Sequence, residues 1–230
     1  MGLWITLRQN KEKSFFRDNL LNMISNKKEL DGNYLVLASG YFSEYESSPY
    51  STLGDELLRT IQKNDKIKNI DVIGAMGLGQ KPIITFDTFC ERLREGLVGR
   101  TITPRRPENN KWHAKIAMKA RSDKNGITPV CAIIGSSNLT RSSYGKNPPP
   151  QNIKPLPHFN YECDVLIFIN DGFSKNVDPK TAPETIFPGI TKRENGSIYF
   201  PEIQEFSPPE SEQLLHLWKE IMESTYVIEK

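Results

Sequence analysis

Several features are scarce in this sequence of 230 residues, and each scarcity excludes a class of protein. Three cysteines, an odd number without a Cys-x-x-Cys pair, indicate neither a zinc site nor a disulfide framework. We therefore expect Cys90, Cys131 and Cys163 to be buried small side chains in a reducing compartment. The apolar stretch at 165–169 is far shorter than the roughly 18 residues that a membrane span needs. Because the N-terminal residues also lack a signal-peptide pattern, we expect a cytoplasmic protein without a membrane partner.

Net charge is small as well, because 30 basic and 28 acidic side chains leave only +2. This balance excludes a polybasic protein that binds nucleic acid through its overall charge. A surface that binds a polyanion must therefore be local, with basic residues gathered on one face of the fold.

Apolar periodicity alternates between the two element types along the chain. This alternation predicts an α/β (α+β) fold, with a mixed central β-sheet flanked by helices. The predicted helices cover 13–25, 53–61, 86–98 and the segment after Ser207, and the predicted strands cover 34–38, 67–73, 112–118, 130–134 and 165–169. Residues 103–107 predict a loop because of their two prolines, and Asn125-Gly126 predicts a hairpin turn.

Prolines are concentrated late in the chain, since 11 of the 16 lie between Pro148 and Pro209. We expect a single domain over 1–230, with a proline-rich connection at about 145–160 and a C-terminal extension over about 170–230. A capping box at the end of the proline-rich region predicts that this extension contains a helix, which we expect to pack on the sheet.

Polar residues gather at the ends of the predicted strands. Residues two apart in a strand point to the same face, so His113 and Lys115 project together, as do Ser136 and Asn138 if that chain stays extended. The hairpin sets these two pairs side by side. Such a set suits a phosphodiester, with a histidine to attack phosphorus and Lys, Ser and Asn to hold the non-bridging oxygens. Glu162 would orient the imidazole.

His-x-Lys, then Gly-Ser-x-Asn and a later Glu, resembles the half-site of the phospholipase D superfamily. Within it, the chain looks most like the nuclease branch, in particular the metal-independent restriction endonucleases with a phospholipase D-type catalytic domain. The resemblance runs from Trp112 to about Val165. It implies a phospholipase D-like half-site domain that cleaves DNA in restriction or another anti-phage defence, without a metal or other cofactor. It also implies a phosphohistidine on His113, and a second histidine that protonates the leaving group.

The sequence departs from the family pattern at two points. The family often has an aspartate five residues after the lysine, where this chain has Ala120, which favours a nuclease over a lipase. The chain also contains a single His-x-Lys, since His158 and His216 lack the motif. If two half-sites are required, the protein must form a homodimer in which two His113 side chains share one site.

Further basic residues flank the motif and are candidates for binding DNA phosphates. They are Arg105, Arg106, Lys111 and Arg141. A solvated basic loop accounts equally well for the first three. Two nuclease or nucleotide motifs are disfavoured: the glycine-rich run after residue 74 lacks the Lys-Ser/Thr of a P-loop, and a proline interrupts the Asp-x-Lys at 178–180.

Three alternatives stay open at this point. The site could serve a phospholipase or another small phosphodiesterase, or the chain could be a non-catalytic DNA-binding or assembly subunit. Asp164, two residues after Glu162, could orient the histidine in its place. Because no second module for recognising a base sequence is apparent, sequence-specific restriction would need a partner such as an ATPase or a specificity subunit.

Overall fold

The computed structural model of the protein describes residues 2–8, 15–27, 30–42, 52–74, 80–108, 115–137, 139, 162–168, 198–200 and 210–228. Within these residues the strands are β1 Gly2–Arg8, β2 Tyr34–Ala38, β3 Asn69–Ile73, β4 Thr101–Pro107, β5 Lys115–Asp123, β6 Gly126–Gly135, β7 Glu162–Phe168, β8 Ile198–Phe200 and β9 Thr225–Val227. The helices are α1 Phe15–Ser25, α2 Thr52–Lys63, α3 Gln80–Gly96 and α6 Glu210–Glu223.

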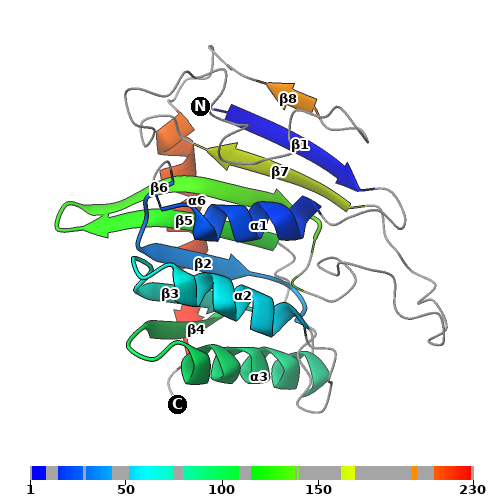
Figure 1. Ribbon diagram of the computed structural model, residues 1–230, viewed down its shortest axis with the longest axis vertical. Coiled ribbons are helices and arrows are strands. Elements are labelled where there is room, and N and C mark those ends of the chain that lie inside the picture. Colours follow the sequence, from blue (N-terminus) through cyan, green and yellow to red (C-terminus); the bar gives the residue numbers. More distant parts are fainter. Residues whose placement is uncertain are drawn as a thin grey trace.

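All of these strands belong to one sheet, in the order β8-β1-β7-β6-β5-β2-β3-β4-β9. The pairs β2–β3 and β3–β4 are parallel, and the other neighbours are antiparallel. The predicted mixed sheet of an α/β fold is therefore confirmed. Figure 1 shows α1, α2 and α3 in front of the sheet and α6 behind it.

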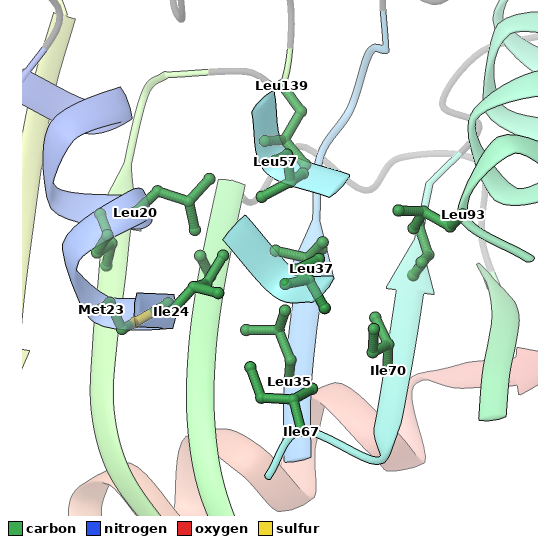
Figure 2. Close-up of a cluster of buried hydrophobic side chains, with 14 of the residues drawn as sticks. Leu20, Met23, Ile24, Leu35, Leu37, Leu57, Ile67, Ile70, Leu93 and Leu139 are labelled. Carbon is green, nitrogen blue, oxygen red and sulfur yellow. The ribbon is translucent and has the colours of Figure 1, made fainter. Parts of the chain in front are cut away.

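The main core lies between the sheet and the first three helices. Strand β2 is apolar throughout, as expected of a strand that is covered on both faces of the sheet. Its Leu35 and Leu37 point toward α1 and α2, where Figure 2 shows them among Leu20, Ile24 and Leu57. A second cluster fills the opposite face, where α6 packs. It contains Val36, Ala38, Ile73, Ile116, Met118, Ala120, Ala132, Leu214, Trp218 and Ile221.

The predicted elements with strong apolar patterns are confirmed. Strand β2 has the predicted bounds, and α1, α2 and β3 differ from the prediction by a few residues at their ends. The predicted hairpin is also present, because β5 and β6 pair up to Asp123 and Gly126, where Gly126 has a φ of 120°. Both strands run closer to the turn than predicted. The predicted C-terminal helix is α6, and it packs on the sheet.

The loop predicted at 103–107 is wrong, because these residues belong to β4. Proline breaks a central strand by removing a ladder N–H, but it is tolerated near a sheet edge. Strand β4 is next to the edge, since its outer neighbour β9 pairs only with residues 105–107. The carbonyl oxygen of Pro104 still forms a hydrogen bond, because it accepts from the N–H of Ile228. The edge position therefore explains a strand that the prolines concealed.

Two further predictions need correction. Helix α3 begins at Gln80 rather than at Phe86, and its Pro82 lies in the first turn, where proline is compatible with a helix. Cys90 and Cys131 are buried as predicted, whereas Cys163 is exposed. None of the helices among the described residues is long and apolar enough to cross a membrane.

Candidate active site

Three strands bring parts of the predicted site to one end of the sheet. Lys115, the first residue of β5, pairs with Gly135, the last residue of β6. On its other side Gly135 pairs with Asp164 of β7. Cross-strand partners point to the same face, so Lys115 and Asp164 flank a glycine on one face. In Figure 1 the β6 arrow points toward the end of the sheet from which β7 starts. The register therefore joins the strand that begins at Lys115 to the strand that ends at Gly135 and to the strand that begins at Glu162.

Lys115 is a buried lysine, with 3% of its surface exposed. It shares a face of β5 with Ala117 and Lys119, since these residues alternate along the strand. Ala117 belongs to the core cluster under α1, α2 and α3, which identifies the face. Lysine is seldom fully buried in proteins, and buried ionisable side chains are concentrated at functional sites, so the position of Lys115 at a strand end makes it a candidate site residue.

Lys119 is buried on the same face but has a different environment. Its Nζ donates to the carbonyl oxygens of Met23 at 3.0 Å, Ile24 at 3.4 Å and Asn26 at 2.6 Å. These carbonyls belong to the end of α1 and the residue after it, so Lys119 caps that helix. Burial lowers the pKa of the Lys119 amine from 10.5 to about 8. Lys119 therefore stabilises the fold and makes a useful comparison for Lys115.

Ser136 lies just beyond β6, and β7 holds it in place. Its backbone N–H donates to the carbonyl of Cys163 at 3.0 Å, and its Oγ accepts from the N–H of Cys163 at 2.9 Å. Ser136 is exposed to solvent. A hydroxyl at an exposed strand end, fixed by a neighbouring strand, can reach an anion that arrives from solvent.

The next residue, Ser137, binds the carboxylate of Asp164. Its N–H donates to Oδ1 at 3.2 Å and its Oγ donates to Oδ2 at 2.6 Å. Gly135 is required by the same carboxylate, because a Cβ there would overlap Asp164 Oδ1. The sequence did not reveal this contact, since Asp164 stood out only as an alternative to Glu162. One signal in the sequence was the spacing of two residues between Glu162 and Asp164, because residues two apart in a predicted strand are expected on the same face.

Several predicted site residues lie outside the described part of the chain. They are His113, Asn138, Lys111 and Arg141. Glu162 is the first residue of β7, and its backbone pairs with Arg8 of β1, although its side chain is not among those described. The orientation of the imidazole by Glu162 therefore stays a prediction. The proline-rich connection at 145–160 lies outside the described residues as well.

The structure does not bring Arg105 to Lys115. The Arg105 Nε donates to Asp71 Oδ2 at 2.6 Å, and Tyr34 Oη donates to the other oxygen at 2.9 Å. Asp71 lies on the α6 face, because it alternates in β3 with Val72, which points into the main core. Burial raises the pKa of Asp71, and the hydrogen bonds from Tyr34 and Arg105 oppose that rise. Arg105 thus has a role in the fold on the face opposite Lys115.

Arg106 points to the face opposite that of Arg105. Its Nη2 lies 3.7 Å from Oδ1 of Asp87 in α3. Phosphate binding by these two arginines remains untested. No group of three or more His, Cys, Asp or Glu side chains that could hold a metal ion occurs among the residues that the structure describes. Comparison of the chain with protein-family models finds no match, and comparison with curated proteins finds none either.

Proposed function

We propose that this protein is a metal-independent phosphodiesterase that cleaves DNA through a phosphohistidine, in a site that two copies of the chain share. Restriction or another anti-phage defence is the setting that the motif resemblance implies. The single observation that carries the proposal is the register in which Lys115 faces Gly135 and Gly135 faces Asp164. It supports the proposal because motif segments far apart in the sequence meet at one end of the sheet.

Each residue of the motif has a role in the proposed reaction. A nitrogen of His113 attacks phosphorus, a P–N bond forms, and the P–O bond to the leaving nucleotide breaks. Lys115, Ser136 and Asn138 bind the non-bridging oxygens, on which charge redistributes in the transition state. Glu162 orients the imidazole by accepting from its second nitrogen.

A second histidine completes the reaction. The leaving oxygen takes a proton from His113 of the other copy, which acts as general acid. Water then attacks the phosphohistidine, the P–N bond breaks, and the same second histidine takes the proton of the water. Because the chain has one His-x-Lys, the homodimer supplies this second group.

Cleavage of plasmid DNA in excess EDTA tests the proposal. The wild-type protein should cut, whereas His113→Ala and Lys115→Met should lose nearly all cutting. Lys119→Met is the matched control, because Lys119 is buried on the same face of β5 but binds the carbonyls of α1. It should retain cutting per folded molecule at a temperature well below its unfolding midpoint.

Two outcomes would replace the proposal by the alternatives. Hydrolysis of a phosphatidylcholine vesicle without DNA cleavage would favour a phospholipase. DNA binding without turnover would favour a non-catalytic subunit. Cutting by the wild type that His113→Ala leaves unchanged would contradict the mechanism directly. If a partner such as an ATPase or specificity subunit is needed for sequence recognition, the protein alone should cut without sequence preference.

A further inference from the structure

Two buried side chains hold the backbone on either side of Asn138. On one side, the Asp164 carboxylate accepts from both the N–H and the hydroxyl of Ser137, at 3.2 and 2.6 Å. On the other side, the Oγ of Ser39 accepts from the N–H of Leu139 at 2.9 Å. Asp164 is 4% exposed and Ser39 is fully buried. Asp164 belongs to β7 and Ser39 directly follows β2, so Ser137 and Leu139 are held by residues from two other parts of the chain.

Asp164 is set in place by β7 and by the absence of a side chain at Gly135. Gly135 is its cross-strand partner, and a Cβ on Gly135 would overlap the carboxylate. The carboxylate therefore lies over Gly135, the last residue of β6 and the residue before Ser136. An ionised carboxylate can only accept hydrogen bonds, so its two oxygens fix both donors of Ser137 at once.

Ser39 connects Leu139 to the end of β2. It follows the last residue of β2, and its hydroxyl donates to the carbonyl of Tyr41 at 2.6 Å while it accepts from Leu139. Phe42 forms a parallel bridge with Leu139, and the Leu139 side chain is buried in the main core. The chain that leaves β2 thus runs beside Leu139, and Ser39 joins the two segments through one hydroxyl.

We propose that Asp164 and Ser39 are positioning residues that fix the backbone at Ser137 and at Leu139, so that Ser136 is presented to the phosphate without rearrangement. This inference rests on the proposed function. A segment that is held before substrate binds loses little conformational freedom in the transition state, which is the condition for effective catalysis. Both residues act through the segment rather than on the substrate, so their loss should lower kcat and leave KM nearly unchanged.

Asp164→Asn tests the role of the carboxylate. An amide has one acceptor oxygen, so one of the two Ser137 donors loses its partner while the shape of the side chain is kept. We expect kcat to fall about 100-fold, because a small misplacement of a catalytic group costs about that much. Steady-state hydrolysis of bis(4-nitrophenyl) phosphate in excess EDTA measures kcat and KM without a target DNA sequence.

Asp71→Asn is the matched control. Asp71 is 1% exposed and accepts two side-chain hydrogen bonds, at 2.9 and 2.6 Å, but it lies on the α6 face. We expect it to lower the unfolding midpoint to a similar extent and to keep the wild-type kcat. If Asp164→Asn does not fold, Ser137→Ala retains the backbone hydrogen bond and should lower kcat about tenfold, as the loss of one hydrogen bond does.

Ser39→Ala tests the second side independently. It removes the acceptor of the Leu139 N–H, and kcat should fall with KM nearly unchanged, as for Asp164→Asn. A kcat equal to that of the wild type in Asp164→Asn and Ser39→Ala would overturn the positioning role and leave the proposed function intact. An equal fall in Asp71→Asn would overturn it too, because general destabilisation would then explain the loss. Absence of hydrolysis and DNA cleavage by the wild type would overturn the proposed function, and the positioning role with it.

Discussion

Replacing Lys119 by methionine should separate the fold from the site most clearly. Three carbonyl oxygens, of Met23, Ile24 and Asn26, accept from its Nζ, and Lys119 is fully buried. A buried acceptor without a donor costs about 1–3 kcal/mol, whereas removal of a buried amine offsets part of this loss. We expect Lys119→Met to lower the free energy of unfolding by about 3 kcal/mol at neutral pH.

The difference in free energy of unfolding between Lys119→Met and the wild type should depend on pH. Burial lowers the pKa of Lys119 to about 8 in the folded state, from an ordinary 10.5. Between these values the unfolded chain binds more protons than the folded one, so this group makes the wild type more stable as pH rises. Lys119→Met lacks the group, and its deficit should therefore increase by about 2 kcal/mol between pH 7.5 and pH 9.5.

Urea unfolding followed by circular dichroism at the two pH values measures this difference. Lys66→Met is the matched control, because Lys66 is half-exposed and binds Asp31 at 2.9 Å. A surface pair of this kind contributes about 0–1 kcal/mol, so the control should change little. A Lys119→Met deficit that stays constant or shrinks toward pH 9.5 would refute the assignment of a buried, deprotonation-prone amine.

The remaining predictions concern Arg105 and the proposed homodimer. Arg105→Ala should lower the free energy of unfolding by about 3 kcal/mol, because Asp71 stays buried without its cation, and should keep the wild-type cleavage per folded molecule. A fall of about 1 in the slope of log DNA affinity against log salt would instead identify Arg105 as a phosphate contact. Sedimentation equilibrium should give twice the chain mass of 26.2 kDa. If the site is shared, a mixture of wild type and His113→Ala should lose more activity than dilution explains, and an active monomer would contradict the shared site.

The parts of the fold that sequence reasoning predicted are those that local pattern decides. Strand β2 is an apolar run of five residues that is followed by Ser39-Gly40, and the predicted bounds agree with those observed. The β5–β6 hairpin follows from Asn125-Gly126, whose glycine adopts a φ that other residues rarely take. These features need no information about distant residues.

The parts that were missed depend on which strands are neighbours. Strand β4 was predicted as a loop because its prolines read as breakers, and only its place beside the sheet edge makes them acceptable. Asp164 in β7 binds Ser137, and Ser39, directly after β2, binds Leu139. Because β7 and β2 lie on opposite sides of the β6–β5 pair, no spacing in the sequence relates these contacts. Similarly, Arg105 reads as a basic residue near the motif until its contact with Asp71 shows that it points to the other face.

Trapping the covalent intermediate is the most direct test of the proposed chemistry. The wild-type protein is mixed with end-labelled DNA in excess EDTA, quenched with denaturant within a single turnover, and separated on a denaturing gel. We predict a labelled protein band that acid removes and alkali preserves, as expected of a phosphohistidine, with the modified peptide containing His113. The band should be absent from His113→Ala and present in Asp71→Asn. DNA cleavage by the wild type without any covalent adduct, or an adduct that survives in His113→Ala, would contradict the proposed nucleophile.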